Sequence, residues 1–546
     1  MKKISVLFLL VVLMYSCRNK HQQNQPGSNA STSNDKPESL KKITARDYSI
    51  TTANAYNDVF LDSMAMEHFI SEGRLNDTVT RRMRSFYNAR NYQYAWFASD
   101  GLTEQARSFW SLQNYYKTKD SSAAGKQLAG IIGRLETAED LKVSTDDKNI
   151  LRAELLFTEE FIQYILNNYE AGTVKRKEME RFIPLVKSNS LKTADSLLNK
   201  KHKDKKYYED QNAAYGALKQ QLQKYSAIAK AGGWPTIGAG ALKLKQGAAN
   251  AEVLHIKKRL QTTGEMGFDS TNIFNASLDA AVKVYQSSLG MTADGIISET
   301  LIKEMNVPVQ KRIQQIMINM DRMRWMPEPS GNLMIVNIPE FMLHVYEGKN
   351  MAFEMPVVVG KEGHNTVMFK GDMSLVVFSP YWNVPSDIVE KEILPGMRKN
   401  PNYLSNHHME ITGNTGGLPV IRQLPGEENS LGKVKFLFPN SFNIYFHDTP
   451  AKSLFSKDRR AFSHGCIRLS DPVKMAEYVL RSMPEWDPAA IAAAMNSGVE
   501  KTVLLKNPIP VIITYYTAWV NPNGVLNFRD DVYGHDAQLA KKMFID

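Results

Sequence analysis

At one place the chain reads Ser463-His464-Gly465-Cys466-Ile467-Arg468-Leu469, and His447-Asp448-Thr449-Pro450 lies a short way upstream. These two stretches bring a thiol, two imidazoles and a guanidinium close together in the sequence. A thiol nucleophile needs a base that holds it as the thiolate, and the base needs an acceptor on its other ring nitrogen. Cys466 and His447 can be this pair, and the acceptor could be the Asp448 carboxylate or a main-chain carbonyl. The pattern therefore predicts cysteine chemistry at this turn.

The neighbouring residues favour a strand that leads into a tight turn. The stretch Asn443-Ile444-Tyr445-Phe446 is largely β-branched or aromatic and runs into His447. Gly465 permits a backbone conformation that other residues resist, and main-chain N–H groups at such a turn are suitable oxyanion donors. His464 could shape this oxyanion site or position the loop, and we favour the second. Two other interpretations stay open, a structural cysteine and a zinc site made from His-x-Cys and a distant histidine.

Residues 1–17 have the pattern of a lipoprotein signal peptide. Two lysines precede an apolar run of about a dozen residues, which is too short for a stable membrane-spanning helix. Ser16 before Cys17 resembles a lipoprotein cleavage site, and a lipidated Cys17 would hold the protein to a membrane. An uncleaved signal anchor is the alternative. Residues 18–50 are rich in Asn, Gln, Ser, Lys and Pro, so we expect a flexible tether there.

The chain has only two cysteines, Cys17 and Cys466. An exported protein without a disulfide pair is stabilised by its core, and a lone thiol in an oxidising compartment is a liability unless it has a function. Because lipidation accounts for Cys17, Cys466 is the candidate reactive thiol.

The motifs His447-Asp448-Thr449 and Ser463-His464-Gly465-Cys466-x-Arg468 resemble those of the L,D-transpeptidase catalytic domain (YkuD type), the peptidoglycan cross-linking family. This resemblance implies that Cys466 is the nucleophile and His447 its base. Arg468 stands where short members usually have Asn, as in the large multidomain lipoprotein form with an extra flap. Thr366-Val367 stands where Thr-Pro is more usual, a departure that touches a loop and not the chemistry. The further stretches that resemble the large members are Tyr381-Trp382-Asn383-Val384-Pro385, Lys391-Glu392-Ile393-Leu394-Pro395, Arg422-Gln423-x-Pro425-Gly426 and Phe438-Pro439-Asn440.

The motifs and the resemblance together provide a set of candidate site residues. Arg468 can hold a carboxylate through its planar guanidinium, with a structural ion pair as the alternative. No metal and no cofactor are expected. The candidate catalytic residues are Cys466, His447, His464 and Gly465, and the candidate substrate-binding residues are Arg468, Ser463, Tyr445 and Trp382.

The expected reaction is acyl transfer through a thioester on Cys466. The resemblance implies that the donor is a tetrapeptide stem of peptidoglycan, cut between its third and fourth residues, and that an amine acceptor completes a 3-3 cross-link. It also implies acylation by carbapenems. The alternatives are an L,D-carboxypeptidase, in which water is the acceptor, and a wall-tethering lipoprotein with an inactive catalytic domain.

The formal net charge of +10 suggests an acidic partner. The export signal, and the lack of a basic stripe with interleaved aromatic residues, argue against nucleic acid. The expected partners are peptidoglycan stem peptides and glycan, and a membrane through lipidated Cys17. The expected location is the cell envelope, anchored by lipid and facing the periplasm. A merely basic, soluble surface is the alternative reading of the charge.

The predicted fold class is multidomain α+β. Apolar residues at three- and four-residue spacing predict a helical scaffold domain over residues 51–225, with helices at 79–87, 104–116, 123–135, 147–168 and 191–198. Residues 226–307 resemble a small three-helix peptidoglycan-binding module, with helices at 251–262 and 275–290. There Asp294-Gly295 is expected to form a turn and cap a third helix. A helical spacer is the alternative.

Residues 308–546 are expected to be a mainly-β catalytic domain with a C-terminal extension. A helix at 312–326 precedes short strands at 333–338, 342–346, 353–359 and 373–378, which predict an all-β sheet or sandwich. Residues 386–440 interrupt this rhythm and predict a mobile flap over the cleft. After the turn we expect a helix at 471–481, a closing strand pair made by 510–516 and Phe528, and a polar tail from His535.

Overall fold

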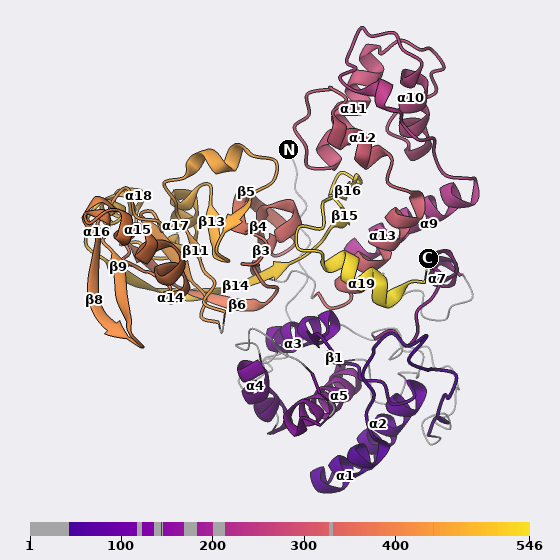
Figure 1. The fold of residues 1–546 in the computed structure, drawn as a ribbon, viewed down its shortest axis with the longest axis horizontal. Coiled ribbons are helices and arrows are strands. Elements are labelled where there is room, and N and C mark those ends of the chain that lie inside the picture. The colour runs from indigo at the N-terminus through magenta and orange to yellow at the C-terminus, as the bar shows by residue number, and fades with distance from the viewer. Residues whose placement is uncertain are drawn as a thin grey trace, which may run out of the picture. The chain divides into compact units, whose positions relative to one another are not determined.

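The described part of the chain begins at Ile43, and Figure 1 shows its helices and strands as a ribbon. The predicted signal peptide 1–17 with Cys17, and residues 18–42 of the predicted tether, lie outside the described residues. Residues 43–50 are folded, because Ile50 is buried and the Asp47 N–H donates to Asn88 O at 2.9 Å. The tether boundary predicted at residue 50 is therefore too far along the chain. The computed structural model describes residues 43–116, 123–135, 143–144, 146–168, 183–199, 213–326, 331–440 and 442–545.

Helices dominate the described residues up to Lys230 and confirm the predicted helical region. Helix α2 begins after Asn76, whose side chain accepts a hydrogen bond from the Val79 N–H at 2.9 Å. The apolar sides of the helices between residues 63 and 168 share one core with the fully buried Trp96, whose ring lies 5.3 Å from that of Phe157. The last two helices of the region contribute instead to the core of the helices that follow. Two short strands, β1 (Phe97–Ala98) and β2 (Gly101–Leu102), pair beside Trp96. The helices are α1 (Ser63–Gly73), α2 (Asp77–Ala89), α3 (Glu104–Tyr116), α4 (Ala123–Leu135), α5 (Lys148–Asn168), α7 (Ser190–Leu198) and α9 (Ala213–Lys230).

Three further helices form the next region, α10 (Glu252–Thr263), α11 (Ala276–Ser288) and α12 (Glu299–Met305), after the short helix η2 (Ala239–Ala241). Gly295 has a φ of 75°, as the predicted turn requires. The predicted cap is corrected: the side chain of Ser298 accepts from the first turn of α12, whereas Asp294 accepts from Ile296 N–H and from Gln286. Helix α13 (Val309–Met323) follows, and its apolar residues share one core with these helices.

The C-terminal region is built on one nine-stranded sheet, which confirms its predicted mainly-β character. The strand order is β12-β5-β13-β11-β10-β6-β14-β3-β4, and β5 also pairs with β4. The second pairing closes the sheet on itself, so the region is a closed barrel, whereas the sequence predicts an all-β sheet or sandwich. Three of the pairings are parallel, namely β11 with β13, β12 with β5, and β14 with β3. The strands are β3 (Asn332–Asn337), β4 (Met342–Glu347), β5 (Asn350–Gly360), β6 (Lys370–Phe378), β10 (Val434–Leu437), β11 (Phe446–His447), β12 (Ala461–Ser463), β13 (Ile467–Leu469) and β14 (Lys501–Thr514).

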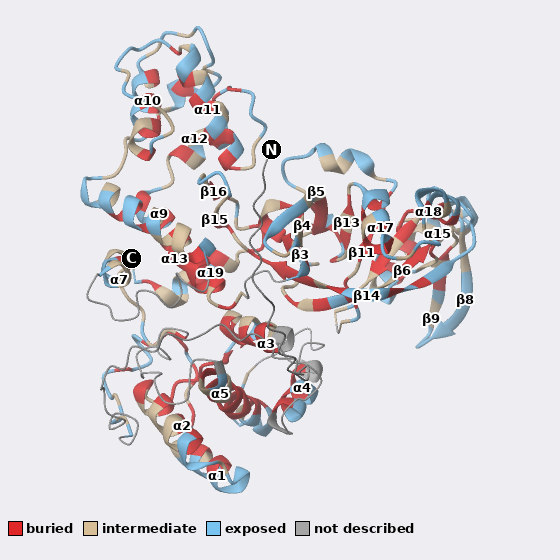
Figure 2. Ribbon diagram, turned by 180° about the vertical axis from the view of Figure 1, so that it is seen from behind, coloured by how far each residue is buried: buried red, intermediate tan, exposed pale blue. Residues whose placement is uncertain are grey.

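Buried apolar side chains fill the inside of this sheet and the space under two helices, α17 (Pro472–Leu480) and α18 (Pro488–Met495). Met475 and Leu480 of α17 and Ile491 of α18 belong to the same core as the strands. Figure 2 shows buried residues along β6 and β14, and also in α5 of the helical region. The helix predicted at 471–481 is thus confirmed, and α17 covers the sheet beside the motif residues. Two short 3-10 helices, η3 (Ile338–Glu340) and η5 (Lys452–Ser456), connect strands of the region.

The predicted flap is a folded unit with its own small core. Val389, Ile393 and Ile421 are buried in a cluster that is separate from the barrel core. The predicted flap end at 440 is too late, because β10 and the buried Phe438 belong to the barrel. The elements are β7 (Trp382–Asn383), α14 (Ser386–Ile388), the π-helix η4 (Val389–Ile393), α15 (Leu394–Lys399), α16 (Tyr403–Asn406), β8 (Met409–Thr415) and β9 (Leu418–Gln423), with the strands in the order β7-β9-β8.

The C-terminal residues fold as a hairpin and a helix instead of ending as a polar tail. The predicted strand at 510–516 is the end of β14, and the pair around Gly524 is β15 (Ala518–Val520) with β16 (Leu526–Phe528). From His535 the chain forms α19 (His535–Met543), whose Leu539 is buried in the core shared with α13. Helix α19 is therefore docked by apolar packing that its largely polar sequence conceals.

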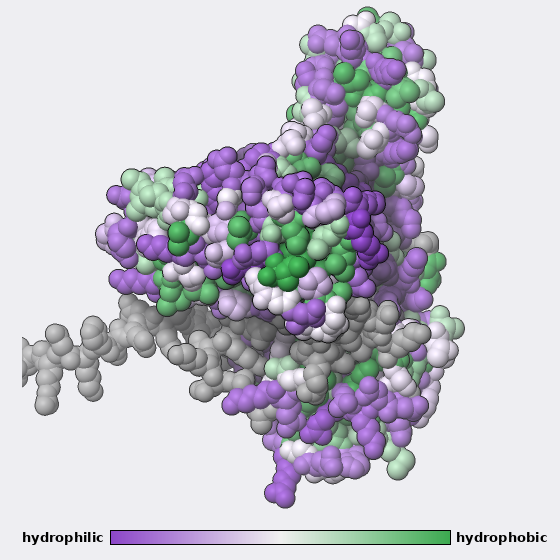
Figure 3. Space-filling model, turned by 60° about the vertical axis from the view of Figure 1, so that its left-hand side comes forward, coloured by the Kyte–Doolittle hydropathy of each residue, from purple (hydrophilic) through white to green (hydrophobic). Residues whose placement is uncertain are grey.

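Figure 3 shows one face of the molecule, on which apolar residues gather near the middle within a mostly hydrophilic surround. The exposed large apolar side chains of the C-terminal region come from six different helices and strands and from two positions outside them, so we assign no binding surface to them. Within the described residues, no helix is long and apolar enough to cross a membrane. The exposed side chains in question are Met351, Ile411, Val420, Phe462, Val473, Val499, Leu504 and Ile545.

Candidate active site

The parallel pairing of β11 and β13 brings the two sequence motifs together. Phe446 lies opposite Ile467, and His447 lies opposite Arg468. Phe446 and Ile467 are fully buried in the barrel core. Since successive side chains of a strand point to opposite faces, the neighbours of these two residues share the other face. Those neighbours are Tyr445, His447, Cys466 and Arg468.

His447 is held as a neutral imidazole. Its Nδ1 lies 2.5 Å from the main-chain oxygen of Asp448, which can only accept, so Nδ1 carries the proton. Burial and the nearby Arg468 lower the pKa of His447 to about 3. Nε2 is therefore left without a proton at neutral pH and can take one.

The structure decides between the two acceptors that the sequence leaves open. The Asp448 carboxylate is engaged elsewhere, because it accepts from the Lys433 N–H at 2.9 Å, the Thr449 N–H at 2.7 Å and the Lys452 ammonium at 2.7 Å. The partner of the His447 ring is thus the carbonyl of Asp448 and not its side chain. The carboxylate instead ties down the loop that carries this carbonyl.

Cys466 is a free thiol beside Tyr445. Burial raises the pKa of the thiol, and Sγ donates to the main-chain oxygen of Asn443 at 3.6 Å. Burial likewise raises the pKa of Tyr445, and the rings of Tyr445 and His447 lie 5.8 Å apart. The surroundings favour a neutral thiol and a neutral imidazole, whereas the sequence interpretation expects a standing thiolate.

The turn before Cys466 is held by its own hydroxyl groups. Gly465 has a φ of 110°, a conformation that favours glycine. The Ser463 hydroxyl accepts from Gly465 N–H at 3.2 Å and donates to Cys466 O at 2.5 Å. The sequence predicts that Ser463 binds substrate, but the residue is buried, and its hydroxyl makes both of these hydrogen bonds within the turn. From the other side, the Thr366 hydroxyl donates to Gly465 O at 2.7 Å.

His464 connects the turn to the flap. Its Nε2 lies 3.0 Å from the Glu392 carboxylate of η4 and 3.4 Å from the Lys361 ammonium. The His364 ring packs edge-on against it at 4.8 Å. Burial, followed by the charge of Lys361, lowers the pKa of His464. These contacts match the interpretation of His464 as a residue that positions the loop.

Arg468 is a partly buried cation that lacks a carboxylate partner. Its Nε is buried with no hydrogen-bond partner, and no ion pair joins Arg468 to an acidic residue in the described parts of the chain. Burial lowers its pKa, but an arginine stays charged at neutral pH. The surroundings therefore suit an anion supplied from outside.

Trp382, the remaining predicted substrate-binding residue, belongs to the flap. It lies in β7, pairs with Gln423 of β9, and packs against the small core of the flap. Where the structure describes the chain, no contact joins Trp382 to Cys466 or His447. Three further residues contact the turn or the loop beside it but are not among the predicted site residues: Lys361, Glu392 and Tyr533. Only Glu392 had a signal, its place in a stretch resembling the large transpeptidases.

In the ranges that the structure describes, no group of three or more His, Cys, Asp or Glu side chains is placed to hold a metal ion. His464 is engaged by Glu392, and the His447 ring by a main-chain carbonyl. The zinc interpretation of the motif thus gains no support.

Comparison with known families agrees with this geometry. Residues 331–512 match the family model of the L,D-transpeptidase catalytic domain (YkuD). The chain contains an L,D-transpeptidase catalytic domain. Residues 81–222 match the model of the Scaffold domain, which covers most of the helical region. The family resemblance, and the fold class that follows from it, are confirmed.

Individual relatives are consistent with this assignment. A Haemophilus influenzae protein whose name places it among the L,D-transpeptidases is 30% identical over 254 residues, or 43% of this chain and 51% of that protein. The chain thus spans about half the length of this relative. Two solved structures share much less. An L,D-transpeptidase fragment from Xylanimonas cellulosilytica is 13% identical with a TM-score of 0.16, over 50% of this chain and 97% of that one.

The second solved structure is the LD transpeptidase LdtMt1 in complex with imipenem. It is 14% identical with a TM-score of 0.18, over 34% of this chain and 59% of that one. At such TM-scores neither structure bears on the details of the site. The family models and the sequence relative therefore carry the assignment.

Proposed function

We propose that this protein is an L,D-transpeptidase that uses Cys466 as its nucleophile and His447 as its base. The observation that carries the proposal is the parallel pairing of β11 with β13, which puts His447 opposite Arg468 and beside the turn that carries Cys466, with the His447 Nδ1 proton held by the Asp448 carbonyl. This tautomer leaves Nε2 free to accept a proton, as a general base must. The acyltransferase family of the catalytic domain agrees with this chemistry.

In the first half of the proposed reaction, Sγ of Cys466 attacks a peptide carbonyl carbon while Nε2 of His447 takes the thiol proton. A carbon–sulfur bond forms and the carbonyl oxygen becomes an oxyanion. When the intermediate collapses, the carbon–nitrogen bond breaks, and the leaving amine takes the proton from the imidazolium. Because the resting pair is neutral, proton removal accompanies the attack rather than preceding it.

In the second half, an amine acceptor attacks the thioester. His447 takes a proton from the amine, the carbon–sulfur bond breaks, and the proton returns to the thiol. Transfer to an amine gives a cross-link, whereas transfer to water gives a shortened stem. Both outcomes use the same two residues, so the acceptor alone separates the transpeptidase from the L,D-carboxypeptidase.

Two groups can stabilise and orient the substrate. No described residue accepts a hydrogen bond from the Cys466 N–H, whereas the Gly465 N–H is occupied by Ser463. We assign the Cys466 N–H as an oxyanion donor. Arg468, with its unpartnered Nε, is assigned to a carboxylate of the substrate, as at the end of a peptide stem.

The substrate class follows from the family resemblance: tetrapeptide stems of peptidoglycan, cut between their third and fourth residues, with 3-3 cross-links as products. Glycan is the further expected partner. We propose the cell envelope as the location, with attachment to a membrane through lipidated Cys17, which lies outside the described residues. If Cys17→Ser left membrane fractionation unchanged, an uncleaved signal anchor would be favoured over lipidation.

Purified stem peptides provide the decisive test. The full chain is incubated with disaccharide-tetrapeptide, and the products are separated by liquid chromatography and mass spectrometry. A cross-linked dimer supports the transpeptidase, a tripeptide monomer without dimer supports the carboxypeptidase, and neither product supports a tethering protein. Cys466→Ala should form no product while it melts as the wild type does; any turnover by this variant would refute the nucleophile assignment.

A further inference from the structure

A series of hydrogen bonds reaches the nucleophile turn from the far C-terminal part of the chain. Tyr533 lies between β16 and α19, beyond residue 512 where the match to the catalytic domain ends. Its buried hydroxyl donates to Gly360 O at 2.6 Å and accepts from the Thr366 N–H at 3.2 Å. The Tyr533 hydroxyl thus connects Gly360 and Thr366, the two ends of the loop 360–366. This loop also supplies the Lys361 N–H that donates to Ser463 O at 2.8 Å.

Thr366 connects the loop 360–366 to the turn that carries Cys466. Its hydroxyl accepts from the Gly360 N–H at 2.9 Å and donates to Gly465 O at 2.7 Å. The peptide group that contains Gly465 O also contains the Cys466 N–H, and the two point in opposite directions because the group is planar and trans. Holding Gly465 O therefore fixes the direction of the Cys466 N–H. That N–H is the proposed oxyanion donor.

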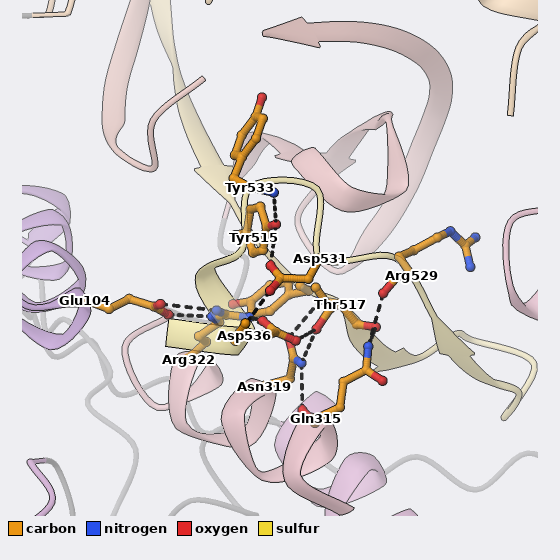
Figure 4. Close-up of polar contacts among 12 residues, drawn as sticks. Glu104, Gln315, Asn319, Arg322, Tyr515, Thr517, Arg529, Asp531, Tyr533 and Asp536 are labelled. Atoms are coloured by element: carbon orange, nitrogen blue, oxygen red, sulfur yellow. Dashed lines mark hydrogen bonds and ion pairs between the residues drawn. The ribbon is translucent and has the colours of Figure 1, made fainter. Parts of the chain in front are cut away.

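Tyr533 is itself held firmly. Its N–H donates to the Tyr515 hydroxyl at 2.8 Å, and this hydroxyl donates to Asp531 at 2.7 Å. The two tyrosine rings stack at 5.8 Å. Figure 4 shows these contacts above the end of α13.

The same segment is fastened to two helices. Asp536 of α19 accepts from Arg322 of α13 at 2.5 Å and from the Thr517 hydroxyl at 2.5 Å. Arg322 in turn donates to both oxygens of Glu104 in α3, at 2.5 and 3.2 Å. Figure 4 shows Arg322 between the two carboxylates. The position of Tyr533 is thus set by contacts outside the catalytic domain proper.

We propose that Tyr533 is a positioning residue that orients the Cys466 peptide group through Thr366, which makes the segment after β14 a working part of the active site. For its catalytic consequence the proposal rests on the proposed function. Its structural content, an ordered Gly465–Cys466 peptide group, stands independently of any activity. The two can therefore be tested separately.

The test compares Tyr533→Phe with Tyr285→Phe in the full chain. Tyr285 is a matched control, because it also has a buried hydroxyl, which accepts from Arg259 at 3.0 Å. Tyr285 lies in the three-helix region and takes no part in the hydrogen bonds that lead to the turn. Both variants lose one buried hydroxyl and keep the ring. Intact-protein mass spectrometry follows acylation of Cys466 by a carbapenem and alkylation by iodoacetamide. Hydrogen exchange is read in a peptide that spans residues 461–469.

Tyr533→Phe should slow acylation by about ten- to a hundredfold, because a misdirected donor no longer meets the oxyanion. Alkylation should stay within about twofold of the wild type, since attack on a saturated carbon builds no oxyanion. Exchange in residues 461–469 should become faster. Tyr285→Phe should leave all three unchanged. If the acylation rate and the exchange of Tyr533→Phe match those of Tyr285→Phe, the proposal is wrong.

Thr366 provides a second, independent arm. Thr366→Val removes the hydroxyl at nearly constant shape and should slow acylation at least as much as Tyr533→Phe, whereas Thr366→Ser should retain most of the rate. The double variant Tyr533→Phe/Thr366→Val should be no slower than Thr366→Val alone, since both act on one peptide group. If the losses in acylation rate of the two single variants were fully additive in the double variant, the proposal that both residues act on one peptide group would be wrong. A wild type that carbapenems do not acylate would count against the proposed function, while the exchange measurement would still decide the role of Tyr533.

Discussion

Arg322 is buried and Arg468 is partly buried, and their surroundings differ. Arg322 has a side chain that is 4% exposed and lies between the carboxylates of Glu104 and Asp536. Burial by itself would lower its pKa, but the two carboxylates outweigh burial and raise it. Arg468 has no carboxylate partner among the described residues, and burial lowers its pKa. The comparison shows one cation that joins helices to each other and another whose buried Nε has no hydrogen-bond partner among the described residues.

Two histidines of the barrel region repeat the contrast. His344 lies 3.0 Å from Glu340 and 3.2 Å from Glu354. Burial would lower its pKa, but these carboxylates raise it to about 9. His447 has a carbonyl as its ring partner, and its pKa is about 3. A paired, charged histidine supports the fold, whereas an uncharged one beside a thiol can move a proton.

The largest expected effect comes from removing the uncharged histidine. His447→Ala should slow acylation of Cys466 by about a hundredfold to ten-thousandfold, because the thiol loses its base. The urea midpoint should stay close to that of the wild type. Acylation rates from intact-protein mass spectrometry check this. A loss smaller than about tenfold would move the base to His464.

Breaking the paired arginine should damage stability instead. Arg322→Met leaves Glu104 and Asp536 buried without a cation, and we expect a loss of about 3–5 kcal/mol in the free energy of unfolding. Urea unfolding followed by circular dichroism measures it. The control is Arg84→Met, which removes an exposed pair with Glu67 and should cost less than about 1 kcal/mol. Equal losses in the two variants would contradict the contrast between paired and open sites.

Removing the open arginine should change selectivity and leave the fold intact. Arg468→Met should slow acylation by a carbapenem about ten- to a hundredfold, because the carboxylate of the reagent loses a charged hydrogen bond. Alkylation by uncharged iodoacetamide should change less than about twofold. Arg481→Met, which removes a surface pair with Glu347, is the control and should affect neither. If both reagents slow equally, Arg468 supports the turn rather than a substrate.

The smallest effect concerns pH. The pKa of His344 is raised in the folded state, so its contribution is full below about pH 6.5 and is lost as pH rises through 9. We expect the wild type to lose about 1–3 kcal/mol more than His344→Gln between pH 6 and pH 10. Besides Glu340 and Glu354, the strand that carries His344 also carries Tyr346 and Glu347, and both are present in both proteins. Parallel stability curves for the two proteins would show that the pair contributes nothing.

The local features of this protein could be predicted from its amino-acid sequence alone. Apolar spacing placed α3, α4 and α17 nearly to the residue, because a helix depends on side chains only three or four positions apart. The Cys466 and His447 motifs were recognisable because the chemistry requires those residue types in a short stretch. The need for glycine at 465 was likewise visible, since it follows from one backbone angle.

The groups that surround these residues became known from the three-dimensional fold and not from the sequence. It selected the Asp448 carbonyl over the carboxylate as the partner of His447, enclosed the hydroxyl of Ser463 in the turn, and docked α19 where a tail was expected. It also brought Tyr533 to Thr366, 167 positions away. Contacts of this kind depend on the pairing of strands that are distant in the sequence and on the ion pairs of buried charged groups. Neither produces a periodic pattern in the sequence, because the residues involved come from distant segments that meet only in the folded protein.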